Sequence, residues 1–311
     1  MRVVSLFSGI GGLDKGFEDA GYHVIWANDF DKFAVQTYRA NYKNNIVHGD
    51  INEIPLDEIP DCEVLIGGFP CQPFSMMGGQ RGFEDARGTL FFRIAEILRD
   101  KIRKDQKPKA VILENVKRLM THDQGRTFAT IKRILEDDLG YHVYADFLNS
   151  AEHGVPQTRN RTYIVCFANK NAEFQFPQPV KLEKCLQDLL EENVNQKYFL
   201  SDRILPTILS NGTGGYQAKS EIDLKVARPL CATMAKMHRA CQDNYVTQNG
   251  RVRRLTPREC ARLQGFDDDF VIPVSDCQAY KQFGNAVTVD VSRAVAKSVR
   301  DTLENVGEWK D

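Results

Sequence analysis

The sequence predicts an α/β fold: a Rossmann-like, doubly wound and mostly parallel sheet with helices on both faces, joined to a smaller irregular domain. Two observations predict this fold. Short β-rich runs alternate with amphipathic helical stretches over the first half of the chain, and the periodicity weakens after Ala168. The composition, 42% hydrophobic and 27% charged over 311 residues, is ordinary for a globular protein and excludes a disordered, collagen-like or coiled-coil chain.

The alternating elements follow one another through short connections. The expected strands are Val3 to Phe7, His23 to Asn28, Glu63 to Ile66, Ala110 to Leu113, Tyr141 to Leu148 and Thr162 to Phe167. The expected helices are Leu13 to Ala20, Lys32 to Asn41, Thr89 to Lys104 and Thr127 to Leu139. Because such an alternation builds a parallel sheet, ligands should bind at the carboxyl ends of its strands.

The chain is expected to divide into three parts, 1–172, 173–276 and 277–311. A linker-like run from Phe174 to Pro179 opens the second part. In the third part, apolar residues recur at helical spacing from Val287 to Leu303. We therefore expect this last helix to pack back on the first part.

Charge and cysteine usage narrow the class of protein. Forty-one basic residues against 42 acidic ones give a net charge of -1, which excludes a uniformly basic, histone-like binder. The apolar runs are much shorter than the roughly 20 residues that span a bilayer, and the N-terminus has no signal-peptide pattern. None of the eight cysteines forms a C-x-x-C pair. We expect a cytoplasmic protein with reduced thiols, no membrane contact and no metal.

A glycine-rich turn, Phe7-Ser8-Gly9-Ile10-Gly11-Gly12, follows the first expected strand. Glycines at such a turn let the backbone approach a ligand closely. Asp29 and Asp50 stand at the ends of the next two strands, where carboxylates suit ribose hydroxyls and an adenine amino group. The pattern indicates a nucleoside cofactor. By itself it also fits a purely structural turn, and it does not separate a nicotinamide cofactor from S-adenosylmethionine.

A cysteine flanked by prolines follows the strand at Glu63 to Ile66, in the run Gly67-Gly68-Phe69-Pro70-Cys71-Gln72-Pro73-Phe74-Ser75. A doubly wound fold has its active site at such a strand end, so Cys71 is a candidate nucleophile. Its thiol, with an ordinary pKa near 8.5, needs a positive neighbour or help from its reacting partner. The segment from Met76 to Gly82 is expected to move as a lid. An inert or buried thiol is the alternative.

Glu114 follows the strand at Ala110 to Leu113, on the same expected sheet edge as Cys71. A buried carboxyl there can act as an acid or a hydrogen-bond donor, and a helix-capping role is the alternative. Arg159 and Arg161 are two residues apart, so they should project to one side of an extended chain. That arrangement suits a carbonyl and a phosphate, with a solvated surface as the alternative.

With these residues in place, the sequence resembles the DNA cytosine-5 methyltransferases over nearly its whole length. Six motifs occur in the order of that family: Phe7 to Gly12, Gly68 to Gln72, Glu114 to Val116, Gln157 to Arg161, Arg254 to Phe266 and Gln282 to Val287. Two of these motifs lie at the ends of the expected strands Val3 to Phe7 and Glu63 to Ile66. Six motifs in this order are not expected to occur by chance.

The resemblance implies methylation of carbon 5 of a cytosine that is flipped out of duplex DNA, with S-adenosylmethionine as the cofactor. It assigns Cys71 to attack carbon 6, Glu114 to hold N3 and the exocyclic amine, and Arg161 with Arg159 to hold O2 and the sugar-phosphate. By the same resemblance, residues 1–172 are expected to form the catalytic domain. The family usually has glutamate where this chain has Asp29. The implied cofactor contacts are Phe7, Gly9, Ile10, Gly11, Gly12, Asp29, Phe30, Asp50, Ile51, Gly68, Pro70 and Asn285.

By the same resemblance, residues 173–276 form the target-recognition domain. Thr233-Met234 is the nearest match to the Thr-Leu pair of the family. Five arginines at 251, 253, 254, 258 and 262 suit phosphate contacts, although a solvated helix face is the alternative for the last two. The expected DNA-binding residues are Gln72, Ser75, Gln80, Arg81, Thr233, Arg254 and Arg258.

The leading interpretation is a monomeric methyltransferase of a restriction-modification pair that acts on double-stranded DNA and is associated with the bacterial nucleoid. A transfer RNA methyltransferase of the same family is one alternative, although the sizeable variable region favours duplex DNA. A non-catalytic, methyltransferase-like DNA-binding protein is a second, but both Cys71 and Glu114 are present. A nicotinamide-dependent dehydrogenase is a third, and it leaves those two residues without a role.

Overall fold

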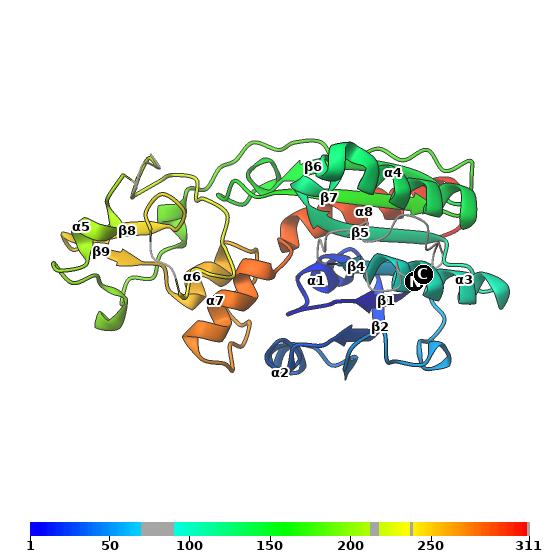
Figure 1. The fold of residues 1–311 in the computed structure, drawn as a ribbon, viewed down its shortest axis with the longest axis horizontal. Coiled ribbons are helices and arrows are strands. Elements are labelled where there is room, and N and C mark those ends of the chain that lie inside the picture. The colour runs from blue at the N-terminus through cyan, green and yellow to red at the C-terminus, as the bar shows by residue number, and fades with distance from the viewer. Residues whose placement is uncertain (70–89, 212–217, 237–238, 310–311) are drawn as a thin grey trace.

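The computed structural model describes residues 1–69, 90–211, 218–236 and 239–309. Its main feature is a seven-stranded sheet of strand order β3-β2-β1-β4-β5-β7-β6 (Figure 1). The strands are β1 (Arg2–Leu6), β2 (His23–Asp29), β3 (Asn45–His48), β4 (Val64–Gly68), β5 (Ala110–Val116), β6 (His142–Asn149) and β7 (Asn160–Phe167). The predicted mostly parallel sheet is thereby confirmed.

β7 runs antiparallel to both of its neighbours, whereas β1 to β5 are mutually parallel. The connection from β6 to β7, which includes a short 3-10 turn at Ser150–His153, contains no crossover helix. A parallel pair needs such a crossover, so the direct connection makes these strands antiparallel.

Helices cover both faces of the sheet, as predicted. One apolar core joins Val4 and Leu6 of β1 to α3 (Leu90–Arg103) and α4 (Arg126–Arg133), which continues as a π-helical turn (Ile134–Asp138). The opposite core joins Val3 to α1 (Gly12–Asp19) and α8 (Val289–Asn305). Alternate residues of one strand therefore enter opposite cores, as the two-residue period of a strand requires.

The C-terminal helix returns to the sheet. Gly16 of α1 leaves no room for a Cβ against Ser292 of α8, and the Ser292 hydroxyl donates to the Leu13 carbonyl at 2.8 Å. The helix predicted over Val287 to Leu303 is thus confirmed, and it packs where it was expected.

The second half of the described chain contains fewer regular elements. Its helices and strands are α5 (Leu205–Ile208), β8 (Tyr245–Gln248), β9 (Arg251–Arg254), α6 (Pro257–Arg262) and α7 (Asp276–Asn285). The remaining helix of the sheet region is α2 (Lys32–Asn41). β8 and β9 form an antiparallel pair far from the sheet in Figure 1, and α6 and α7 lie between the two regions. The remaining short 3-10 turns are Leu56–Glu58, Lys117–Met120, His122–Gly125, Leu186–Leu189 and Gln196–Tyr198.

The two regions share an apolar core. Ile10 of the glycine turn and Ala34 of α2 belong to the same cluster as Leu263, which follows α6, and Phe283 of α7. The proposed boundary between 276 and 277 therefore stays a prediction. Among the helices in the described ranges, none is long and apolar enough to cross a membrane.

Candidate active site

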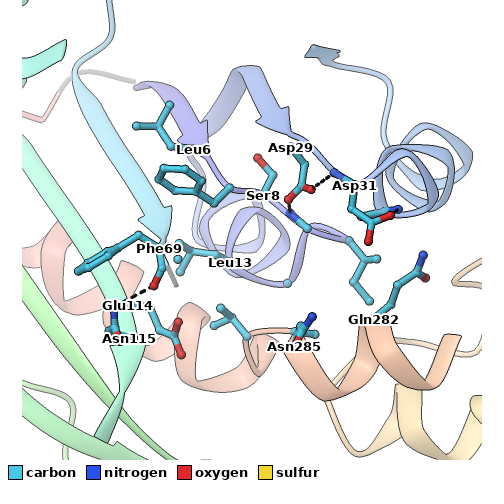
Figure 2. A pocket seen from close by; sticks show the side chains of 18 of the residues that line it. Leu6, Ser8, Leu13, Asp29, Asp31, Phe69, Glu114, Asn115, Gln282 and Asn285 are labelled. Carbon is cyan, nitrogen blue, oxygen red and sulfur yellow. Dashed lines mark hydrogen bonds between the residues drawn. The ribbon is translucent and has the colours of Figure 1, made fainter. Parts of the chain in front are cut away.

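A cavity of about 910 Å³ opens at the carboxyl ends of β1, β2, β4 and β5 (Figure 2). This is the edge at which the parallel strands were expected to bind a ligand. One end of the cavity is formed by the glycine turn and Asp29, and the other by Glu114 and Arg161. Asn285 and its neighbours on α7 close a further side.

The glycine turn has a left-handed backbone at three alternate positions. Phe7, Gly9 and Gly11 have φ of 55°, 58° and 83°. A Cβ on Gly11 would overlap the ring of Tyr42, whose hydroxyl donates to the Gly11 carbonyl at 2.8 Å. Glycine is required there both for the backbone conformation and for the close approach.

Asp29 fixes this turn. Its Oδ2 accepts from the Gly9 N–H and its Oδ1 accepts from the Asp31 N–H, both at 2.8 Å (Figure 2). Burial raises the pKa of Asp29, and the two backbone donors oppose that rise. Because each carboxylate oxygen keeps a second acceptor site, Asp29 can also receive hydroxyl donors from a ligand.

α7 contributes two residues to the cavity wall that were not among the expected cofactor contacts, Lys281 and Gln282. Lys281 Nζ lies 2.6 Å from Asp31 Oδ2, and Gln282 Oε1 accepts from the Thr37 hydroxyl at 3.0 Å. Both contacts join α7 to α2. The available sequence signal was weak, since Lys281 directly precedes the motif from Gln282 to Val287 but is not part of it.

Glu114 lies beside the end of β4, opposite Gly68 in the strand pairing. Its Oε1 is 3.1 Å from Arg161 Nε, an ion pair whose two side chains are 10% and 21% exposed. Burial raises the pKa of Glu114, and the positive charge of Arg161 opposes that rise. The neighbouring Asn115 amide donates to the Phe69 carbonyl at 2.8 Å and so ties β5 to the chain that follows β4.

Arg159 was expected to face one site with Arg161, but it is not among the residues that line the cavity. Its buried guanidinium donates to the carbonyls of Leu230 (3.0 Å), Gly284 (3.0 Å) and Ala286 (2.8 Å). Burial lowers the pKa of Arg159 to about 9, which leaves it protonated at neutral pH. The chain turns just before β7, where the Arg159 N–H donates to the Gln157 carbonyl, so the spacing rule for an extended chain fails there.

The other expected cofactor contacts divide into three groups. Phe7, Gly9, Ile10, Gly12, Phe30, Gly68 and Asn285 line the cavity. Gly11, Asp50 and Ile51 do not: Gly11 faces Tyr42, Asp50 is exposed and accepts from Asn52, and Ile51 is buried in the apolar core. Pro70 lies outside the described residues, as do Cys71 and the expected DNA contacts Gln72, Ser75, Gln80 and Arg81.

The remaining expected DNA contacts are held by the protein itself, except for the exposed Thr233. Arg254 donates to the Met234 carbonyl at 2.9 Å and stacks 4.3 Å from the Tyr280 ring centre. Arg258 donates to the carbonyls of Asp267 (3.2 Å) and Phe270 (2.7 Å).

The arginines of this arginine-rich segment are engaged by groups of the protein itself, and their contact with phosphates stays a prediction. Arg253 and Glu259 form a fully buried ion pair at 2.7 Å, and Arg262 pairs with Asp268 at 2.7 Å. Arg251 donates to the Gln196 side chain at 2.7 Å. Glu259 and Asp268 are acids that the sequence shows nearby, but the other acceptors include backbone carbonyls, which a count of charges does not reveal.

Comparison with known proteins shows the family to which the chain belongs. The family model described as C-5 cytosine-specific DNA methylase matches residues 1–301. The Type II methyltransferase M.NlaX of Neisseria lactamica is 41% identical over 99% of each chain. M.SsoII of Shigella sonnei, another Type II methyltransferase, is 42% identical over 98% of this chain and 81% of that protein.

Solved structures share the fold. The S. pombe Dnmt2 methyltransferase has a TM-score of 0.79 at 21% identity, over 98% of this chain and 99% of that one. Together with the match of the family model to nearly the whole chain, these findings identify the chain as a DNA cytosine-5 methyltransferase of the C-5 cytosine-specific DNA methylase family.

Proposed function

We propose that the protein transfers a methyl group from S-adenosylmethionine to carbon 5 of a cytosine that has been flipped out of a specific duplex DNA sequence. The observation that carries the proposal is the single cavity in which the glycine turn and Asp29 lie at one end and the Glu114–Arg161 pair at the other. A site for a cofactor and a site for a polar base thus lie at the two ends of one cavity.

The residues at the first end fit S-adenosylmethionine. The Asp29 carboxylate retains acceptor capacity for the ribose hydroxyls, and the left-handed turn at Gly9 allows the backbone to approach the ligand closely. Phe30 is 70% exposed at the rim, where its ring offers a face to an adenine. The bound cofactor supplies an electrophilic methyl group.

The residues at the second end fit cytosine. A Glu114 carboxyl with a raised pKa can donate a hydrogen bond to N3 of the ring and accept one from its exocyclic amine. Arg161 is the neighbouring cation for the O2 carbonyl. Both interactions draw electrons from the ring and favour nucleophilic attack on carbon 6.

Cys71 is the proposed nucleophile. Its sulfur forms a bond to carbon 6, and the ring electrons make carbon 5 nucleophilic toward the methyl group. After methylation, which leaves S-adenosylhomocysteine, carbon 5 loses its proton to water, the 5,6 double bond forms again, and the bond from sulfur to carbon 6 breaks to release the Cys71 thiolate. The ring atoms are inaccessible in a stacked duplex, so the base must be flipped at a cost of a few kcal/mol.

Two further points belong to the proposal. Residues 173–276 read the DNA sequence, and the enzyme acts as a monomer. The relatives at about 40% identity are named Type II methyltransferases, which supports a role in protecting DNA from a partner restriction endonuclease.

The proposal is tested with methyl-labelled S-adenosylmethionine and unmethylated genomic DNA, with transfer RNA and the Cys71→Ala variant in parallel. We expect label in DNA as 5-methylcytosine and none with the variant. Label only in transfer RNA would overturn the substrate while keeping the chemistry. If folded wild-type protein binds the cofactor but labels neither nucleic acid, the protein is a silent DNA-binding relative.

A further inference from the structure

A chain of buried hydroxyl and carboxyl groups lies behind the glycine turn. The Ser8 hydroxyl donates to Ser5 Oγ at 2.9 Å, the Ser5 hydroxyl donates to Asp14 Oδ2 at 3.0 Å, and the Tyr38 hydroxyl donates to Asp14 Oδ1 at 2.8 Å. All four residues are buried. Ser5 and Ser8 also line the cavity, so the chain leads from the cavity wall to the Asp14 carboxyl.

Three acids of the described residues line the cavity, and Asp14 lies behind its wall. Asp29 accepts from the N–H groups of Gly9 and Asp31, both at 2.8 Å. Asp31 is paired with Lys281 at 2.6 Å, and Glu114 is paired with Arg161 at 3.1 Å. Asp14 differs from Asp31 and Glu114, because both of its side-chain hydrogen-bond partners in the described ranges are neutral hydroxyls.

Among the described residues, the neighbours of Asp14 on each packed element bring no unpaired positive charge. On its own helix, Glu18 is also an acid, and the adjacent Lys15 is already paired with Asp19 and Asp267, each at 3.2 Å. On α2 the titratable groups are Tyr38 and Tyr42, and burial raises the pKa of each phenol well above its ordinary value. β1 contributes only the Ser5 hydroxyl.

α8 packs against the far side of α1 and carries Arg293. Its guanidinium lies 2.7 Å from Asp19 and 2.7 Å from Asp290, so its charge is already paired. Within the part of the chain that the structure describes, the Asp14 carboxylate therefore has no cation of its own. A cation bound in the cavity is the remaining source of compensation.

We propose that Asp14 is a specificity-determining residue for the methyl donor, and that its carboxylate favours cationic S-adenosylmethionine over neutral S-adenosylhomocysteine. The donor has a sulfonium, an ammonium and a carboxylate, hence a net charge of about +1, and methyl transfer removes the sulfonium charge. In a low-dielectric interior, an uncompensated negative charge discriminates between two such ligands. The inference rests on the proposed function, because both ligands belong to the proposed reaction.

This arrangement links binding to proton release. Burial raises the pKa of Asp14 to about 7, so the carboxyl is partly protonated in the free protein at neutral pH. A nearby cation favours the ionised form and lowers that pKa, so binding of the donor releases protons. The neutral product lacks the sulfonium charge and should release fewer.

The first test uses the wild-type protein without DNA, so that no methyl transfer occurs. Titration calorimetry at pH 7, in two buffers of different ionisation enthalpy, counts the protons released on binding each ligand. We expect more protons to be released by S-adenosylmethionine than by S-adenosylhomocysteine. The preference for the donor, expressed as the ratio of the two Kd values, should rise about tenfold from pH 6 to pH 8.

The second test uses the near-isosteric variant Asp14→Asn, with Glu18→Gln as the control acid on the same helix. Asp14→Asn should lose the excess proton release and the pH dependence of the preference, and Glu18→Gln should keep both. Equal proton release for the two ligands in the wild type overturns the inference even if Asp14→Asn does not fold. If the wild type binds neither ligand, the proposed function fails, and this inference fails with it.

Discussion

Two regions of the molecule use the same kind of ion pair in different ways. At the cavity, the Arg161–Glu114 pair is partly exposed, at 21% and 10% of the two side chains. In the arginine-rich segment, Arg253 and Glu259 are both fully buried. A ligand can reach the first pair and cannot reach the second. The difference teaches that an arginine of a family motif can act either on a ligand or in holding the fold together. Its exposure to the cavity decides which of the two roles it has.

The hydrogen bonds of the buried pair explain why it is structural. Both Glu259 oxygens accept from Arg253, at 2.7 and 2.8 Å, and they also accept from the N–H groups of Glu191 and Thr256. The carboxylate thus holds a strand, a helix start and a distant loop together. Removing one charge from such a site leaves the other buried without a partner.

Glu259→Gln should therefore produce the largest effect on stability. We expect the free energy of unfolding to fall by about 3–5 kcal/mol, because the Arg253 guanidinium is left buried and uncompensated. Denaturant unfolding followed by circular dichroism measures the change. The double variant Arg253→Met with Glu259→Gln is the control, and it should recover part of the loss. An unchanged midpoint in the single variant would remove the distinction between the two pairs.

Glu114→Gln should affect activity instead. The amide can still donate to N3 and accept from the exocyclic amine, but it cannot transfer a proton to N3, so methyl transfer should fall by about 10²–10⁴-fold. The unfolding midpoint should stay close to that of the wild type, since the Glu114 pair is open to the cavity. Turnover with labelled cofactor, compared with cofactor affinity of the same preparation, separates the two effects. A loss of stability as large as that of Glu259→Gln would contradict the comparison.

The sequence predicted the sheet region well because its determinants are local. Alternation along each strand and apolar spacing along α1, α2, α3 and α8 are visible in single segments, and the glycine turn needs glycine for its own backbone. The direction of β7 was not predicted, because it depends on how the connection from β6 is made.

The roles of the arginines were not predictable in the same way. Arg159 is bound by carbonyls at positions 230, 284 and 286, which are far away in sequence. No spacing rule brings these atoms together. Likewise, Lys281 enters the cavity wall only because α7 packs on α2, through its ion pair with Asp31.

Arg159 and Arg161 allow a sharper comparison within one motif. Arg159→Lys keeps the charge but replaces three directed hydrogen bonds to carbonyls, so we expect a loss of about 1–3 kcal/mol in the free energy of unfolding. Arg161→Lys should lower turnover clearly and leave the free energy of unfolding close to that of the wild type. Both variants are measured by denaturant unfolding and by labelled-methyl turnover. Equal losses of stability in the two would show that Arg161 is also architectural.

The smallest effect is expected for Arg258, where sequence and structure point in different directions. The resemblance assigned it to DNA, whereas its guanidinium donates to the Asp267 and Phe270 carbonyls. If these bonds are its role, Arg258→Gln should lower stability by about 1 kcal/mol. The dependence of DNA affinity on salt should then keep its slope, because no phosphate contact is lost. The slope is measured by fluorescence anisotropy with a labelled duplex over a range of salt concentrations.

The exposed Lys132, on α4, provides the matched control for that measurement, because its charge is paired with Glu136 at 3.7 Å and its helix lies on the sheet region. Lys132→Gln should leave both stability and slope unchanged. A slope that falls by about one unit for Arg258→Gln alone would show that this arginine contacts a phosphate. The carbonyl bonds seen here would then orient the guanidinium for DNA, and the arginine-rich segment would combine the two uses that the comparison separates.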